Sequence, residues 1–257
     1  MSQTLKDHNA LVTGGSSGIG LAIADALAAA GASVAISGRR QEALDRAVEA
    51  LEKHGGRALA VAGDVADPRD AHRMVEEAAA AFGGLRILVN NAGIARGGPL
   101  GTMDEATVHA LVDIDLKGPI FVTRAALPHL ERYRDDGGAA VVNISSSVTF
   151  SATKNFSVYS AAKAGVEMLT RCWALDHAED RIRVNAISPG VVETPIFETM
   201  MPAAAASRAL DQFAAATPLG RVGQPRDVAE VALFLADARS RWMTGAVIPL
   251  DGGLSLA

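Results

Sequence analysis

The chain has 257 residues, enough for one large domain or two small ones, and its 49% hydrophobic and 21% charged residues are ordinary for a globular protein. A formal net charge of −5 disfavours a nucleic-acid partner, and the single cysteine, Cys172, excludes an intramolecular disulfide and a thiolate metal cluster. Because the start of the chain has no apolar signal-peptide core, and glycine and serine interrupt its longest uncharged stretch, we expect a cytoplasmic protein without a membrane partner.

Short runs of Val, Ile, Leu and Ala alternate with amphipathic segments along the whole chain, as in parallel strands that are buried on both faces and connected by helices. The alternation predicts an α/β fold: a single doubly wound, Rossmann-type domain over residues 1–257, with a seven-stranded, mainly parallel sheet and helices on both faces. The least regular region, about 190–225, is expected to form either a substrate lid or a surface excursion without function. Strands are expected at 10–13, 33–37, 58–62, 87–90, 139–144, 183–187 and 246–250, and helices at 21–30, 41–54, 68–82, 158–177 and 226–237.

A glycine-rich turn follows the first expected strand and opens a helix. Its glycines allow a sharp turn close to a ligand, and the helix N-terminus offers free N–H groups to a pyrophosphate. The spacing is G-x-x-x-G-x-G rather than G-x-G-x-x-G, and a plain strand–helix connection would also explain it. Its place after the first strand favours a nucleotide site, with contacts from Gly14, Ser16, Ser17, Gly18, Ile19 and Gly20.

The end of the second expected strand bears on which nucleotide binds. An acidic residue there would hold the ribose hydroxyls of NAD, whereas an arginine would bind the 2′-phosphate of NADP. The strand runs into Gly38, Arg39 and Arg40, and no acidic residue appears before Glu42. We therefore predict NADP(H), with Arg39 as the main contact and Arg40 in support, while NAD(H) remains possible if both arginines only begin a solvated helix.

Tyr159 and Lys163 are spaced so that both lie on one face of an expected helix. The lysine ammonium would stabilise the ionised phenol, as a general acid/base for an alcohol–ketone pair requires. Tyr133, the other tyrosine, lies in a charged run and is expected at the surface. Ser146 follows a buried strand, where its hydroxyl could donate to a substrate carbonyl.

With these motifs in order, the chain closely resembles the short-chain dehydrogenase/reductase family over nearly its whole length. The resemblance implies that Tyr159 transfers the proton, that Lys163 assists it and binds the nicotinamide ribose, and that Ser146 polarises the carbonyl. The interval of thirteen residues from Ser146 to Tyr159 is the family's usual one. The resemblance also implies cofactor contacts from Asp64, Val65, Asn91, Ala92, Gly93, Tyr159, Lys163, Pro189, Gly190, Val192 and Thr194.

Asp115 stands where the family usually has an asparagine that holds a water near the lysine. Three interpretations are open. Asp115 could still bend its helix and anchor the water, it could raise the pKa of Lys163 and shift the pH optimum, or it could lower activity. In each of them Asp115 belongs to the predicted catalytic group.

The substrate is expected to be a small-molecule ketone or secondary alcohol. The alternative is reduction of 3-oxoacyl chains on acyl carrier protein. The resemblance implies that this chain has Gly137 and Asp180 at the two positions where such reductases have arginines that dock the carrier. Acidic side chains at Asp135, Asp136 and Glu179 would repel an acidic carrier. An alternative of another class is a non-catalytic dinucleotide sensor, against which the intact Ser146, Tyr159 and Lys163 argue. The expected pocket walls are 94–100, 148–156 and 191–201, with Phe150, Phe156, Ile196, Phe197, Met200 and Met201 making them mostly apolar.

Members of the family usually form tetramers, and the apolar residues of segment 158–177 could cover a partner or the core. We expect a homotetramer. No metal site is predicted, because the histidines have no ligand spacing. They are His8, His54, His72, His109, His129 and His177.

Overall fold

Seven strands form one sheet in the computed structural model, which describes residues 4–196 and 203–257. Every strand pair is parallel, and the order β3-β2-β1-β4-β5-β6-β7 reverses direction between β1 and β4. The predicted doubly wound, Rossmann-type α/β fold is confirmed. The strands are β1 (Asn9–Thr13), β2 (Ser33–Gly38), β3 (Ala58–Ala62), β4 (Ile87–Asn90), β5 (Ala139–Ile144), β6 (Ile182–Pro189) and β7 (Val247–Leu250).

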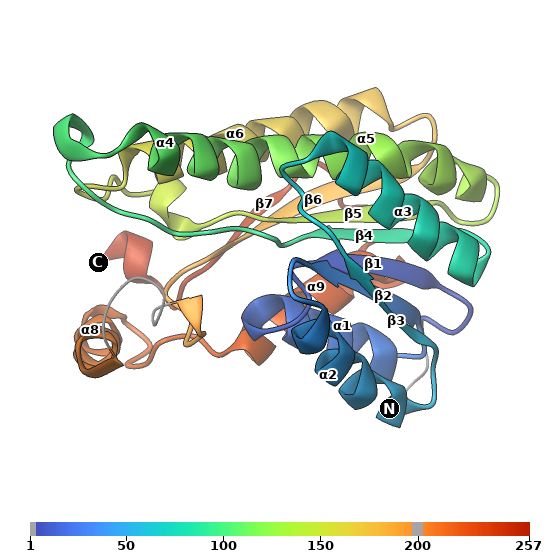
Figure 1. Ribbon diagram of the computed structural model, residues 1–257, viewed down its shortest axis with the longest axis horizontal. Coiled ribbons are helices and arrows are strands. Elements are labelled where there is room, and N and C mark those ends of the chain that lie inside the picture. The colour runs from blue at the N-terminus through green and yellow to red at the C-terminus, as the bar shows by residue number, and fades with distance from the viewer. Residues whose placement is uncertain (1–3, 197–202) are drawn as a thin grey trace.

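Helices cover both faces of the sheet (Figure 1). One face carries α1 (Gly18–Ala29), α2 (Gln41–Leu51) and α9 (Pro225–Ala236). The other face carries α3 (Pro68–Phe82), α4 (Glu105–Val112), α5 (Gly118–Leu130) and α6 (Ser157–Asp176). The helix α8 (Ala203–Ala216) lies apart from both layers, near the C-terminus in Figure 1.

The strand residues divide between two apolar cores because successive side chains point to opposite faces. In β1, Ala10 and Val12 pack with α1, α2 and α9, whereas Leu11 packs with α3 and α5. In β2 the same division separates Val34 from Ala35. Burial on both faces is why these strands read as continuous apolar runs.

Periodicity did not predict α4, α5 and α8. Helices α4 and α5 are joined without a loop by a π-helical turn, Asp113–Lys117, and prolines lie near both ends of α5. An inserted residue shifts the helical phase, so a single 3.6-residue pattern does not run through the segment. The predicted helix 41–54 ends as an α-helix at Leu51 and continues as a short 3-10 turn, Glu52–His54.

The excursion predicted at about 190–225 contains α8 and returns to its own beginning. Val192 and Gly223 form a parallel bridge, in which Gly223 N donates to Val191 O and Glu193 N donates to Gly223 O. The two ends of the excursion are thereby fixed beside the carboxyl end of β6. Its role as a lid stays a prediction.

In the two described stretches of the chain, no helix combines the length and the apolar character needed to cross a lipid bilayer.

Candidate functional site

Tyr159, Lys163 and Ser146 come together where β5 ends and α6 begins. Tyr159 lies in the first turn of α6 and Lys163 one turn later, with Lys163 Nζ 5.8 Å from the centroid of the Tyr159 ring. Lys163 is buried and donates to Ile144 O at 3.1 Å, which ties it to the last residue of β5. Ser146 follows two residues after that strand. The structure therefore places the three predicted side chains at the carboxyl ends of the strands.

Asp115 forms a direct ion pair with Lys163, at 3.1 Å from carboxylate oxygen to Nζ. The π-helical turn carries Asp115 into the interior, where it is fully buried and also accepts from Ile94 N. Burial raises the pKa of Asp115, and the Lys163 ammonium opposes that shift. Burial alone would lower the pKa of Lys163, but the Asp115 carboxylate, with a smaller effect of Tyr159, raises it above its usual range. The pair holds a charged lysine at the site.

The turn after β4 lies against the glycine turn after β1. Asn91 Nδ2 donates to Thr13 O at 2.9 Å and to Gly14 O at 3.2 Å. Thr13 Oγ1 accepts from Asn91 N and Ala92 N, each at 3.0 Å. Gly93 packs beside the ion pair, since a Cβ there would lie 2.6 Å from Asp115 Oδ1 and 3.3 Å from Lys163 Nζ. The predicted residues Asn91, Ala92 and Gly93 thus connect the glycine turn to Lys163.

The start of α1 has the features of an anion site. Gly14 has φ +65°, and a Cβ there would lie 2.9 Å from Ala92 Cα, so this turn requires glycine. Ser17, the N-cap, makes no side-chain capping bond, and the first turn of α1 has no acidic residue. The first N–H groups of α1 are therefore available to a phosphate. Thr194 lies over this turn, with Cγ2 3.3 Å from where a Cβ on Gly18 would be.

Ser16, Ile19 and Gly20 complete the predicted turn. Ser16 and Ile19 are half-buried, and Gly20 is buried with no room for a side chain, because a Cβ there would collide with Asn91 Nδ2 and Gly14 O. A pyrophosphate could therefore approach the backbone closely at this turn.

Arg39 and Arg40 are exposed at the end of β2. Arg39 lines a cleft of about 320 Å³ together with Asp64 and Arg73. Asp64 N donates to Asp70 at 2.9 Å, and Asp70 pairs with Arg73 at 2.8 Å, an ion pair that lowers the pKa of Asp70. A second hollow of about 420 Å³ continues from Asp64 along the start of α3.

Val65 and the end of β6 bound the site on two further sides. Val65 is 7% exposed, and a Cβ on Gly118 would lie 2.8 Å from its side chain. Gly190, directly after Pro189, donates from its N to Leu250 O at 3.0 Å. Val192 is buried and forms the bridge to Gly223.

The structure describes the expected pocket walls at residues 94–100, 148–156 and 191–196. The Phe156 ring meets the Tyr159 ring edge to face, with centroids 6.1 Å apart, and a Cβ on Gly97 would lie 2.7 Å from the Phe156 ring. Phe150 is exposed at 45%. Phe197, Met200 and Met201 lie outside the described residues.

Glu167 is a buried residue of the site that the sequence analysis missed. It lies one helical turn beyond Lys163, and its Oε1 accepts from Ser145, Thr149 and Ser188 hydroxyls. The four-residue spacing from Tyr159 through Lys163 to Glu167 was a signal that could have found it.

Two features lie at the opposite edge of the sheet, where β5 and β6 begin. Tyr133 is half-buried under Arg86 rather than at the surface as expected.

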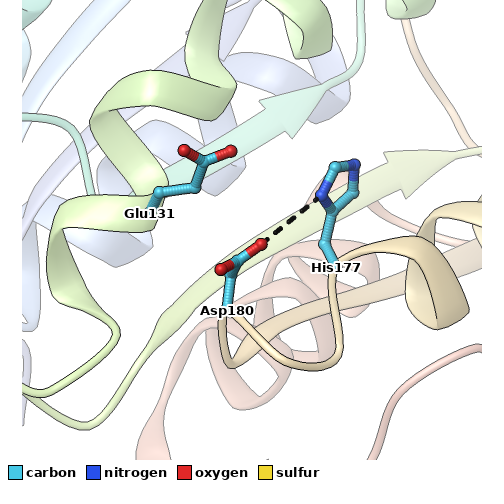
Figure 2. A group of neighbouring side chains, drawn as sticks. All are labelled: Glu131, His177 and Asp180. Carbon is cyan, nitrogen blue, oxygen red and sulfur yellow. Dashed lines mark ion pairs between the residues drawn. The ribbon is translucent and has the colours of Figure 1, made fainter.

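Figure 2 shows Glu131, His177 and Asp180 side by side, with His177 Nδ1 4.0 Å from the Asp180 carboxylate. Asp180 also pairs with Arg134 at 3.6 Å, so an arginine already neutralises part of this group.

Comparisons with known proteins agree with this geometry. The family model described as Enoyl-(Acyl carrier protein) reductase matches residues 14–255. Cis-4-hydroxycyclohexanecarboxylate dehydrogenase of Sinomonas cyclohexanicum is 40% identical over 98% of both chains, and the 3-oxoacyl-[acyl-carrier-protein] reductase FabG of Thermotoga maritima is 38% identical over 95% of this chain and 96% of its own. The crystal structure of 3-ketoacyl-(acyl-carrier-protein) reductase from Brucella melitensis complexed with NADH has a TM-score of 0.89 at 32% identity, covering 98% of this chain and 99% of that one.

Proposed function

The chain belongs to the short-chain dehydrogenase/reductase family of NAD(P)-dependent oxidoreductases. We propose that it transfers a hydride between NADP(H) and a small-molecule ketone or secondary alcohol, and that Tyr159 is the general acid/base. One observation carries the proposal: the half-buried Tyr159 phenol lies beside the buried, ion-paired Lys163 ammonium at the carboxyl end of β5, and Ser146 follows that strand by two residues.

Each side chain has a distinct part in the proposed reaction. In reduction, the Tyr159 hydroxyl donates its proton to the carbonyl oxygen, and in oxidation the ionised phenol takes the proton of the alcohol. The Lys163 ammonium stabilises the ionised phenol. Within residues 4–196 and 203–257, Ser146 Oγ accepts only a long contact of 3.5 Å from Val148 N, so its own proton is available to the substrate oxygen as negative charge develops there.

The residues present fit a dinucleotide. When bound, NADP(H) supplies or takes up the hydride. The α1 N-terminus and the turn from Gly14 to Gly20 would hold the pyrophosphate, and Asp64 and Val65 would contact the adenine. Asn91–Gly93 would flank the bound cofactor, while Pro189, Gly190, Val192 and Thr194 would bind its nicotinamide end. Lys163 donates to two groups within the described residues, which leaves one of its three N–H bonds for the ribose.

We propose Arg39 as the contact to the 2′-phosphate. Within the described residues it has neither an ion pair nor a hydrogen bond, and it lines the cleft beside Asp64. A hydrogen bond between charged groups contributes about 1.5–3 kcal/mol, or roughly 10- to 100-fold in affinity. Arg39→Ala is expected to lower kcat/KM for NADPH by about that factor and to leave NADH little changed.

Steady-state kinetics with both cofactors measure this selectivity. Arg46→Ala on the exposed face of α2 removes the same charge away from the cleft and serves as the matched control. If the parent enzyme is more efficient with NADH than with NADPH, the assignment of Arg39 is wrong.

The substrate class is best tested by NADPH oxidation with a panel of ketones. A cyclic ketone, the same ring with a carboxylate, and 3-oxoacyl chains free and on acyl carrier protein separate the two enzyme hypotheses. Turnover of the free ketones is expected. No loss of NADPH absorbance with any of them would favour the sensor.

Carrier-protein reduction is kept as the second candidate because of the 38% identity to the FabG of Thermotoga maritima. The acidic residues that argue against it have partners of their own, since Asp136 pairs with Arg86 and Asp180 with Arg134. Both pairs lie at the sheet edge opposite Ser146, so within one chain they do not line the site. The charge argument therefore bears on docking alone.

We propose that the chain forms a homotetramer. The exposed side of α6 presents Met168 at 56% and Leu175 at 80%, while the half-buried Trp173 on the same helix packs against the core. Near the C-terminus, Trp242 is 98% exposed and Leu256 90%. Large exposed apolar side chains on two surfaces fit two subunit interfaces, as a tetramer requires. Sedimentation equilibrium measures the number of subunits directly.

A further inference from the structure

Glu167 holds a buried carboxylate whose partners within the described residues are all hydroxyl groups. It is 6% exposed on the inner side of α6. Its Oε1 accepts from Thr149 Oγ1 at 2.6 Å, from Ser188 Oγ at 2.8 Å and from Ser145 Oγ at 2.9 Å. Across residues 4–196 and 203–257 no lysine, arginine or histidine pairs with it. A buried charge is retained at a cost unless its bonds are complete, so these three hydroxyls are what stabilises it.

The three hydroxyls come from segments that surround Ser146. Ser145 precedes it, and Thr149 closes the short turn Ser147–Thr149 that follows it. Ser188 lies on β6, directly before Pro189. Glu167 therefore connects α6, the Ser146 turn and the end of β6 through one oxygen atom.

The hydroxyl protons at the two flanking residues have a choice of acceptor. Ser145 Oγ also lies 3.3 Å from Lys163 O, and Thr149 Oγ1 lies 2.9 Å from Ser146 O. Each hydroxyl has one proton, and an ionised carboxylate is a stronger acceptor than a peptide carbonyl. The Glu167 carboxylate therefore directs the Thr149 proton toward α6, whereas the Ser145 hydroxyl bonds to α6 with either acceptor, because Lys163 O also lies on that helix.

We propose that Glu167 is a positioning residue, which fixes the Ser146 hydroxyl relative to Tyr159 and Lys163 by tying the turn on both sides of Ser146 to the helix that carries them. The inference rests on the proposed function, because it acts through the role given there to Ser146. A displacement of about 1 Å in an oriented group can cost on the order of 100-fold in rate. Glu167→Ala is expected to lower kcat by 10- to 100-fold and to leave the Kd for NADPH within about twofold of the parent.

A double-mutant cycle with Ser146→Ala tests the connection. If Glu167 acts through Ser146, Glu167→Ala costs little in a chain that already lacks the serine hydroxyl, and the two effects on kcat/KM are far from additive. If Glu167 only stabilises the fold, its cost is the same in both backgrounds, and the inference is overturned. Glu167→Gln keeps an acceptor oxygen without the charge and should recover part of the lost kcat.

Thr170→Val is the matched control. Thr170 lies one turn further along α6, is fully buried, and accepts from Asn143 Nδ2 of β5 at 2.8 Å. Its loss also removes a buried bond between α6 and β5, but not at the Ser146 turn, so kcat should stay near that of the parent. A drop equal to that of Glu167→Ala would assign the effect to helix–strand packing.

Backbone hydrogen exchange provides a measurement that does not depend on turnover. The amides of Thr149 and Phe150 donate to Ser146 O and Ser147 O, and they should exchange faster in Glu167→Ala but not in Thr170→Val. Unchanged exchange overturns the inference even if no substrate is found, whereas parental kcat in Ser146→Ala overturns the proposed function instead. If Glu167→Ala does not fold, Thr149→Val removes the shortest of the three bonds and is expected to show the same non-additivity with Ser146→Ala.

Discussion

Replacing Tyr159 by phenylalanine should lower kcat by about 100- to 10,000-fold, the range that positioned general acids and bases contribute. The substitution removes one oxygen and keeps the ring, so the edge-to-face contact with Phe156 and the packing at the start of α6 are retained. Lys163 keeps its bonds to Asp115 and Ile144. The Kd for NADPH should therefore stay within a few-fold of the parent value.

Two measurements separate chemistry from binding in this variant. Single-turnover kinetics report the reaction step, and fluorescence titration reports NADPH affinity. Tyr133→Phe removes the other phenol at the opposite sheet edge and should leave kcat unchanged. Tyr159→Phe with substantial residual kcat would refute the proton-transfer role.

Asp115→Asn should move the pH profile of kcat to lower pH by about one unit. The carboxylate offsets part of the Lys163 charge that stabilises the ionised phenol, and its removal makes that stabilisation stronger. At an effective dielectric constant of about 20, a unit charge removed near the phenol contributes on the order of 1–2 kcal/mol, which corresponds to about one pH unit.

Both limbs of the profile should shift in the same direction. In the parent, burial acts to lower the pKa of Lys163, and the Asp115 carboxylate and the Tyr159 phenol together hold it above its usual range. In Asp115→Asn, burial acts without that opposing charge, so the pKa of Lys163 falls and the charged lysine is lost at a lower alkaline pH. Profiles of kcat from about pH 5 to pH 11 measure both limbs.

The outcome distinguishes the three interpretations of Asp115. An unchanged profile leaves only the anchoring role, and a raised kcat at an unchanged pH optimum would mean that the aspartate lowers activity. Asp113→Asn is the matched control, since it removes an exposed pair with Lys117 in the same π-helical turn. That control should not move the profile.

The sheet was predictable because its signal is local. Buried parallel strands must be apolar along their whole length, and β3, β4 and β5 begin and end at the predicted residues. The place of the candidate site followed from a general rule, that ligands in such sheets bind at the carboxyl ends of the strands, and it stays a prediction.

Contacts between distant segments were not predictable in this way. The direct pair of Asp115 with Lys163 depends on a π-helical turn that no periodicity indicated. Glu167 looks like one more helical residue until Ser145, Thr149 and Ser188 are placed around it. Such partners are fixed by tertiary packing, so their roles follow from the fold and not from the pattern.

The bridge between Val192 and Gly223 bears on how well the segment between them tolerates changes in length. Because the two ends of the excursion are bonded to each other, the chain between them closes on itself at the edge of the domain. Changing the length of such a loop alters its closure entropy only slowly, by about 0.6 kcal/mol for each doubling. A change of length between Thr194 and Gly223 should therefore cost the domain little stability, and we expect the sheet, the glycine turn and the Tyr159–Lys163 pair to keep their structure when this segment is lengthened or shortened.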